Sequence, residues 1–474
     1  MTLLEVPFFG TDVVWSMMIQ FGIIAIGLLV GNILRTKVPF LQKSLIPSAL
    51  LGGAVLLIFK ALPDMQEVIN KSAMEVITYH TLGIGFVALA LKNNGINTKA
   101  KTMTVVETGT LTASTYIIQG IVGLLVTIPL FYFGGKIFYS AGMLLPMGYG
   151  QGPGQAMNIG GIYMDEAAKQ GMVFPGKDFG LSIAAIGFIV GSVISVIYMN
   201  YLKRKGEIKI SEIRERQKNK LSDYEGPNEI PDSESVDKLS IQICLVLMTY
   251  SFVYFFNNWL QTLPLGEFGE RTLMPLMWGF NFFLGTLFGF FVKWILNMLK
   301  KKQVIKREYS NNYLLNRISG FAFDIMIVAG TASINFSELK DYALPLVIIC
   351  TIGAAVTFFY VLKVSKHLYP NYKYEGFFSM FGMLTGTASN GMILLREIDP
   401  KFETPAANNL VLQAVPAVIF GFPVLLLIGL APLGLRQTMI TLAILIVVFI
   451  AFTVFLFRKK IFKKYKTQSE KNIQ

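Results

Sequence analysis

The chain has 474 residues, of which 53% are hydrophobic and only 15% are charged. This composition excludes an ordinary soluble protein and indicates a chain that is dissolved in lipid. The net charge of +13 would suggest a nucleic-acid partner if it belonged to a soluble domain, but the basic residues collect between apolar runs. No nucleic-acid partner is therefore expected.

Soft metal ligands are scarce. The two cysteines, Cys244 and Cys350, lie inside apolar runs, and the chain has only two histidines and no CxxC pair. We therefore expect no disulfide framework, no transition-metal site and no cofactor.

The first half contains five apolar runs near the ~20 residues that a membrane-spanning helix needs. The first run lacks the basic flank and the cleavage pattern of a secretory signal, so we expect it to remain in the mature protein. A further segment, Ile137–Gly161, is apolar but interrupted by glycine, proline and small polar residues, which predicts a re-entrant or broken helix. The five runs are Val13–Leu34, Leu45–Leu62, Ile77–Leu91, Val105–Phe133 and Phe179–Leu202.

A polar, charged stretch, Lys203–Lys238, separates the halves and predicts a cytoplasmic linker, with a regulatory module as the alternative. The second half repeats the pattern, including a second interrupted segment at Phe377–Leu395 and one extra span at Thr438–Phe457. Its five regular spans are Ile241–Leu260, Pro275–Leu299, Arg317–Ile334, Leu344–Leu362 and Leu410–Leu430.

These spans predict an all-α polytopic membrane protein made of two inverted-topology repeats, each with five transmembrane helices and one re-entrant segment. The expected organisation is a first repeat at 1–202 with its re-entrant segment at about 137–161, a linker at 203–238, a second repeat at 239–432 with its re-entrant segment at about 377–395, and an extra helix with a basic tail at 433–474.

The distribution of lysine and arginine predicts the orientation, because short cytoplasmic loops carry the excess. Loops rich in lysine and arginine alternate along the chain with loops poor in these residues. This alternation fits the rule only if each interrupted segment enters and leaves on the same side of the membrane. The N-terminus is then outside and the C-terminus cytoplasmic, in the inner or plasma membrane. Gly148 and Gly386, in the two interrupted segments, lie 238 positions apart, and the preceding spans keep nearly the same offset. Inverted repeats with broken helices are a recurring design of secondary transporters.

The two interrupted segments carry the candidate binding chemistry. The first reads MGYGQGPGQAMNIGG, whose glycines and proline can expose backbone N–H groups and a helix N-terminus to an anion such as a carboxylate. The second reads MLTGTASNGM, whose hydroxyl and amide groups suit a carboxylate and a sodium ion. The predicted substrate-binding residues are Gly150, Gln151, Gly152, Gly154, Gln155, Thr385, Gly386, Thr387, Ser389 and Asn390.

Small residues also serve close helix packing, and that is the reading we give to the GxxxG pairs Gly187/Gly191 and Gly285/Gly289. The interrupted segments differ from these pairs because they occupy corresponding places in opposite halves, which is the pattern of a transporter binding site.

Asp324 is the most informative ionisable residue, because a carboxylate in mid-span costs ~2.5–3.5 kcal/mol on insertion scales unless it is compensated. We predict that Asp324 takes part in cation coupling with Ser389 and Asn390; the alternative is an ion pair with Arg317. His80 is interpreted as an interfacial histidine.

On the long fourth span, Glu107, Gln119 and a run of Thr and Ser residues are interpreted as structural, because such hydroxyls can bond their own helix backbone. Arg396 follows the second interrupted segment and is expected at its cytoplasmic exit, with contact to a substrate carboxylate as the alternative.

These residues resemble the bacterial sodium:glutamate symporter family. The resemblance is carried by Gly150, Gly152, Gly154 and Ala156 in a GxGxGxA string, by LIPSALLGG at 45–53 and by GTASNGM at 386–392, and it covers roughly Val13–Leu430. It implies sodium-coupled uptake of glutamate, a homodimer and an elevator-like movement. The chain departs from the family pattern in its extra span and in having Gln151 and Pro153 inside the glycine string.

Other classes fit less well. No GxxxxGK[ST] string is present for an ATP-driven pump, and the spans carry only scattered acid, base or nucleophilic residues, so an enzyme is not expected. A transporter for another organic anion or amino acid is the principal alternative. An ion channel, which needs a continuous polar pathway, is more remote.

Overall fold

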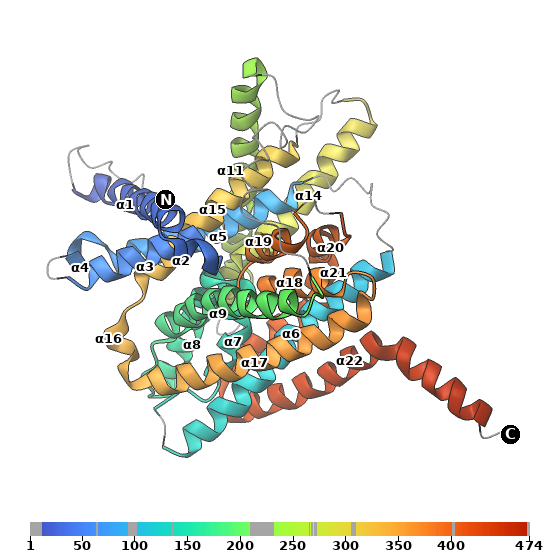
Figure 1. Cartoon of the computed structure of the whole chain (residues 1–474). Coiled ribbons are helices and arrows are strands. Elements are labelled where there is room, and N and C mark those ends of the chain that lie inside the picture. The colour runs from blue at the N-terminus through green and yellow to red at the C-terminus, as the bar shows by residue number, and fades with distance from the viewer. Residues whose placement is uncertain are drawn as a thin grey trace. The chain divides into compact units, whose positions relative to one another are not determined.

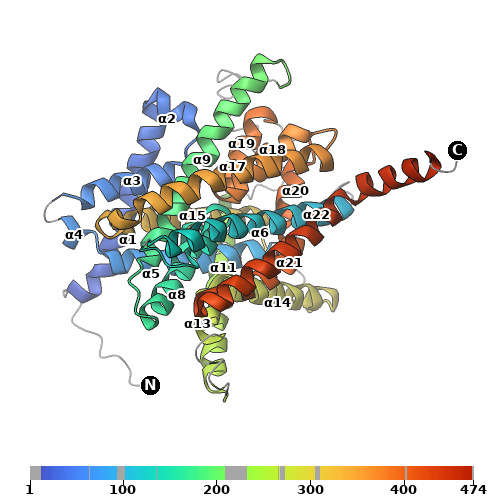
Figure 2. The same ribbon diagram turned by 90° about the horizontal axis from the view of Figure 1, so that it is seen from below.

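The computed structural model describes residues 12–62, 65–92, 102–134, 136–208, 232–264, 266, 269, 273–304, 310–400 and 403–471. Every regular element in these residues is helical (Figures 1 and 2). The expected linker lies mostly outside the described residues. The longer helices are α1 (Asp12–Lys37), α3 (Ser48–Lys60), α5 (Lys71–Ala90), α6 (Thr102–Tyr132), α8 (Pro153–Lys169), α9 (Gly176–Arg204), α11 (Asp232–Gln261), α14 (Asn281–Lys301), α15 (Asn312–Ser333), α17 (Ala343–Leu368), α18 (Lys373–Leu384), α19 (Ala388–Ile398), α21 (Ala414–Leu430) and α22 (Leu435–Lys471).

Short elements connect them. They are α2 (Pro39–Ser44), α4 (Met65–Val68), η1 (Ala141–Met143), α7 (Leu144–Pro146), η2 (Met147–Gln151), α13 (Met274–Gly279), α16 (Phe336–Leu339), η5 (Lys340–Tyr342), α20 (Ala406–Leu412) and η6 (Ala431–Leu433).

Within the described residues, ten helical stretches are long and apolar enough to cross a membrane, and they coincide with ten of the eleven predicted spans. The exception is the predicted span Leu45–Leu62. Its helix α3 begins only after Pro47 and has 13 residues, about 20 Å of helix, which is shorter than the hydrocarbon core. This expectation was wrong because Pro47, near the start of the apolar run, delays the beginning of the helix to Ser48, and α2 ends at Ser44 before the run starts.

The chain divides into two compact units, and each takes helices from both halves of the sequence. The described residues of unit 1 fall within 1–93, 153–158 and 225–336. Here α5 packs against α14 and α15, and α3 packs against α1 and α15. The Lys60 ammonium donates to the carbonyls of Ala332 and Ser333 at 3.2 and 3.1 Å, so a cation caps the C-terminal end of α15.

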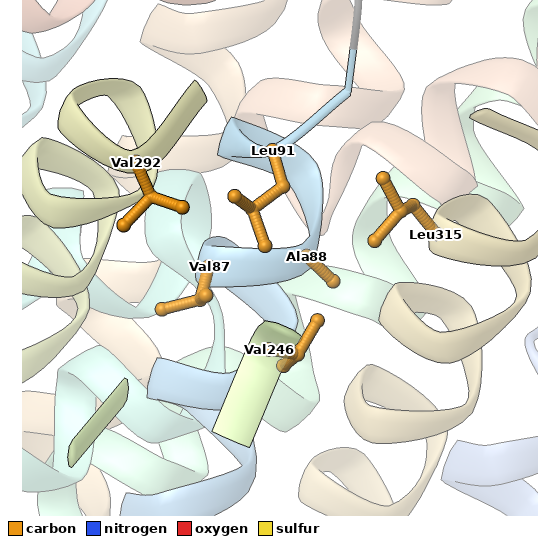
Figure 3. Close-up of a cluster of buried hydrophobic side chains, with 6 residues drawn as sticks. All are labelled: Val87, Ala88, Leu91, Val246, Val292 and Leu315. Atoms are coloured by element: carbon orange, nitrogen blue, oxygen red, sulfur yellow. The ribbon is translucent and has the colours of Figure 1, made fainter. Parts of the chain in front are cut away.

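The core of unit 1 contains a cluster in which four helices meet (Figure 3). On α5 the cluster residues are spaced at i, i+1 and i+4, which places them on one helix face. Their burial joins α5, α11, α14 and α15 through apolar contacts. The six residues are Val87, Ala88, Leu91, Val246, Val292 and Leu315.

The described residues of unit 2 fall within 94–152, 159–224 and 337–474. The long helix α6 packs against α17, α21 and α22, and α9 packs against η2, α17, α18 and α19. Figures 1 and 2 both show α22 running beside α6. Unit 2 therefore contains both interrupted segments, apart from the first residues of α8, which belong to unit 1.

Candidate functional site

The first interrupted segment changes helix type before it breaks. Met147–Gln151 form a wide π-helical turn, and the turn ends at Gly152, whose φ of 83° and ψ of −177° are available essentially only to glycine. Pro153 then opens α8 at its first position, where its missing N–H costs no hydrogen bond. The first-turn amides of α8 consequently have no partner within the helix.

Two tyrosines hold this turn in place inside unit 2. The Tyr116 hydroxyl donates to the Gly150 carbonyl at 3.0 Å, and the fully buried Tyr149 donates to the Cys350 carbonyl at 2.7 Å. A Cβ at Gly150 would lie 2.0 Å from the Tyr116 ring, so no side chain fits there. The wide turn is thus fixed by contacts with α6 and α17.

The second interrupted segment is a break between α18 and α19. Helix α18 ends at Leu384, Thr387 is extended with φ −138° and ψ 168°, and α19 begins at Ala388. Asn390 is 1% exposed, yet both polar atoms of its amide lack a hydrogen-bond partner in the described residues. Because an unsatisfied buried amide costs about 1–3 kcal/mol, this side chain is a candidate ligand-binding group.

Helix α9 contacts both interrupted segments. A Cβ at Gly187 would lie 2.6 Å from the Thr385 carbonyl oxygen and 2.9 Å from the Tyr149 ring. One at Gly191 would lie 2.3 Å from the Thr385 hydroxyl and 3.2 Å from the Asn390 amide nitrogen. Gly187 and Gly191 therefore pack closely, as expected, and they pack against the second break. Gly285 and Gly289 pack on α5 at Val87 and Ala90, as expected for the other pair.

The predicted site residues are divided between the units. Gly150, Gln151 and Gly152 lie in unit 2, as do the five predicted residues at the second break and in the first turn of α19, Thr385, Gly386, Thr387, Ser389 and Asn390. Ser389 is exposed, Thr387 and Gln151 are half-buried, and the other five are buried. Gly154 and Gln155 belong to unit 1.

In unit 1, the first turns of α8 are tightly packed. Gly154 lies against Leu82 and Met326, and the Asn158 amide donates to the Gly279 carbonyl at 3.0 Å, where α13 ends. Gln155 is completely buried, and both polar atoms of its side chain lack a partner in the part of the chain that the structure describes. Like Asn390, Gln155 is a buried amide without a protein partner.

Asp324 lies on α15 of unit 1, two residues before Met326, and its side chain is exposed. The alternative ion pair with Arg317 does not form. Arg317 instead donates to the Tyr313 hydroxyl at 3.3 Å and stacks on its ring, because Tyr313 is one turn away and Asp324 is two. No hydrogen bond or ion pair to Asp324 occurs among the described residues.

His80 is not at a helix end. Helix α5 begins at Lys71, so His80 lies about 15 Å along it, where its ring nitrogen Nδ1 is 3.0 Å from the Tyr250 hydroxyl. The Asn281 amide also donates to the Tyr250 hydroxyl, at 3.1 Å. The apolar run in the sequence starts at Ile77, six residues after the helix does, and the interfacial position of His80 stays a prediction.

The hydroxyl-bearing face of α6 does more than bond its own backbone. Thr108 bonds the Thr104 carbonyl as expected, but it also meets the Tyr369 hydroxyl at 2.7 Å. Further along, Thr112 donates to Gln413 at 2.8 Å. These polar contacts join α6 to neighbouring helices inside unit 2.

Two larger polar side chains of α6 are also buried. The Gln119 amide nitrogen lies 3.0 Å from both the Thr357 hydroxyl and the Leu384 carbonyl. Glu107 accepts a hydrogen bond from Arg458 of α22 at 2.6 Å. The sequence had indicated both residues as structural without identifying these partners.

The loop after the second break is held by Asp399. Its carboxylate accepts hydrogen bonds from the backbone of Glu403 and Thr404 and from the Thr404 hydroxyl. Arg396 lies in the last turn of α19. No group of three or more His, Cys, Asp or Glu side chains that could hold a metal ion occurs in the described residues.

A charged cluster joins the end of α9 to the start of α18. The Tyr374 hydroxyl donates to the Glu207 carboxylate and, as the main cause, holds the pKa of Glu207 below its usual value. Lys373, 4.0 Å from the carboxylate, lowers the pKa further. Tyr374 therefore pairs with an ionised carboxylate at neutral pH.

The ten apolar helices and the paired helix interruptions define a multi-pass membrane protein of the transporter class. The model of the sodium/glutamate symporter family matches residues 15–388, which is more than half of the chain. The chain therefore belongs to the sodium/glutamate symporter family. The match ends at Ala388, the first residue of α19, so Ser389, Asn390 and the extra helix α22 lie beyond it. A comparison with individually curated proteins finds no match.

Proposed function

We propose that the protein is a sodium-coupled secondary transporter that imports glutamate. The observation that carries the proposal is the second break, where Asn390 is buried without a partner beside Thr385 and Gly191. A carboxylate oxygen can accept from the amide Nδ2, and a sodium ion can bind the amide Oδ1. The family supports glutamate and sodium as the pair.

The wide turn and the start of α8 carry the other substrate-binding residues predicted from the sequence. Unpaired first-turn amides favour an anion, and the buried amide of Gln155 offers both a donor and an acceptor. In this proposal Gly150, Gly152 and Gly154 let substrate approach the backbone, and Gln151 contacts the substrate. Asp324, with Ser389 and Asn390, serves cation coupling.

The proposed architecture is a pair of inverted repeats at 1–202 and 239–432, joined by a cytoplasmic linker, with the N-terminus outside and the C-terminus inside. The contact between Gln119 and Thr357 supports it, because these residues are 238 positions apart, the same offset as Gly148 and Gly386. Contact between equivalent residues is expected where a twofold axis passes between repeats. A homodimer and an elevator-like movement complete the proposal.

Glutamate import needs more than one cation. Moving one negative charge inward against about 100 mV costs ~2.3 kcal/mol, and the co-transported cations must offset it. At least two sodium ions per glutamate would make uptake electrogenic.

The test is uptake of radiolabelled glutamate into proteoliposomes with and without an inward sodium gradient. We expect saturable, sodium-dependent uptake that Asn390→Ala abolishes. Asn257→Ala is the matched control, because Asn257 is also completely buried with both amide atoms unpaired, but it lies on α11 of unit 1. Equal losses in both variants would refute the site.

A panel of competing substrates separates the remaining possibilities. If another amino acid or organic anion displaces glutamate and is itself accumulated, the substrate assignment changes while the transporter class stands. Flux that fails to saturate would indicate a channel.

A further inference from the structure

We propose that Gln119 is the positioning residue for the second break, and that its side chain sets the conformation in which Thr385 and Asn390 bind ligand. This inference rests on the proposed function, since it names a residue that serves the same site. Gln119 is completely buried on α6.

Gln119 bonds the last residue of the helix before the break. Its amide nitrogen Nε2 carries two hydrogens, and these match its two acceptors, the Leu384 carbonyl and the Thr357 hydroxyl, each at 3.0 Å. A carbonyl at the end of a helix has no partner within the helix. Gln119 supplies that partner, and in doing so it fixes the point where α18 stops and Thr385 begins.

The position of Gln119 gives this bond a second consequence. Its partner Thr357 lies 238 residues further along the chain, the offset that relates the two interrupted segments. A side chain of the first half thus holds the break of the second half at the junction where α6 crosses α17. Any shift between these two helices is transmitted to Leu384 through one amide group.

The oxygen of the same amide has no partner. Gln119 Oε1 is buried and receives no hydrogen bond in the described residues. A glutamine used only to join helices would be expected to satisfy its acceptor as well as its donors. The orientation of the amide that points both N–H donors at Leu384 and Thr357 leaves its oxygen without a donor.

The contact between α6 and α17 also provides a control. The Tyr360 hydroxyl of α17 donates to the Ser114 hydroxyl of α6 at 2.8 Å. This bond joins the same two helices but has no contact with the second break. Tyr360→Phe therefore removes interhelical bonding without removing the proposed positioning.

The experiment reads the break directly by thiol alkylation. Ala388, the first residue after the break, is exposed and serves as the reporter site through Ala388→Cys. The exposed Cys244 is replaced by Cys244→Ser, and the buried Cys350 is retained. N-ethylmaleimide is the probe, and size-exclusion chromatography confirms that each variant is folded.

We expect Gln119→Leu to raise the rate of alkylation at Ala388→Cys by about fivefold or more. The break then has one hydrogen bond fewer and opens more often. Tyr360→Phe should stay within about twofold of the parent, since it leaves that hydrogen bond in place. Gln119→Glu, whose protonated carboxyl retains one donor, should lie closer to the parent than Gln119→Leu, and it keeps the test available if the leucine variant does not fold.

Uptake kinetics provide the second readout. Gln119→Leu should raise the half-saturating glutamate concentration by about tenfold while the maximal rate falls much less. Equal effects of Gln119→Leu and Tyr360→Phe on both readouts would show that Gln119 only joins helices, and the inference would be wrong. If no variant takes up glutamate but the alkylation contrast persists, the positioning role stands and the proposed substrate fails.

Discussion

The partly buried ion pair between Arg458 and Glu107 should anchor the extra helix α22 to α6. The guanidinium Nη2 lies 2.6 Å from the carboxylate, and the two side chains are 20% and 4% exposed. The guanidinium also lies over the Phe455 ring, 4.2 Å from its centre. Replacing Arg458 with methionine keeps most of the side-chain volume and leaves Glu107 as a buried charge without this partner.

The magnitude follows from the burial of the partner that remains. Breaking a fully buried pair costs about 3–5 kcal/mol, and here the arginine reaches solvent, so we expect Arg458→Met to lower the free energy of unfolding by ~2–4 kcal/mol. Glu107→Gln leaves Arg458, the more exposed partner, without the carboxylate. This variant should therefore lower the free energy of unfolding by less than Arg458→Met does. The double variant should be more stable than the sum of the two single losses predicts, by about 1 kcal/mol or more.

The assay is a double-mutant cycle measured by denaturant unfolding in detergent micelles, with thermal unfolding as a second probe. Additive losses would mean that the two side chains do not interact. A loss below about 1 kcal/mol for Arg458→Met would show that the pair is solvated and does not hold α22 in place.

Three further outcomes are expected. Asp324→Asn should abolish the sodium stimulation of glutamate uptake in proteoliposomes while leaving a monodisperse protein, and unchanged sodium dependence would remove Asp324 from the coupling site. Gly191→Ala should reduce uptake by about tenfold or more, because the new methyl group would lie 2.3 Å from the Thr385 hydroxyl, whereas Gly22→Ala, with nothing within 4 Å, should be neutral. The contact between Tyr374 and Glu207 should stabilise the fold above about pH 5 and weaken as the pH falls through the lowered pKa of Glu207, so the difference in unfolding temperature between wild type and Tyr374→Phe should shrink below about pH 4. A difference that does not change with pH would contradict the pairing.

The spans were predictable because apolar length is a local property of the sequence. Ten predicted spans match helices. The prediction failed at α3 because the apolar residues around Pro47 were interpreted as one span, although a proline there indicates where the helix begins. The predicted start of the third span was late for a similar reason, because polar residues at the start of α5 concealed the beginning of the helix.

The partners of individual residues were harder to predict because they depend on packing between distant segments. The contact between Gln119 and Thr357 could have been found by applying the 238-residue offset to every polar residue. The hydrogen bond to the Leu384 carbonyl has no corresponding pattern in the sequence. The presence of Gly154 and Gln155 in a different unit from Gly152 is likewise set by tertiary contacts.

The composition of the two units also bears on how the protein is made. Helices α1, α3 and α5 leave the ribosome long before α14 and α15, against which they pack, and Lys92 finds Asn316 more than 200 residues later. Neither unit can be completed while only the first half has been synthesised. The early helices must therefore wait in the lipid, and a chain that stops in the linker would present unpaired surfaces to insertion factors and quality-control proteases.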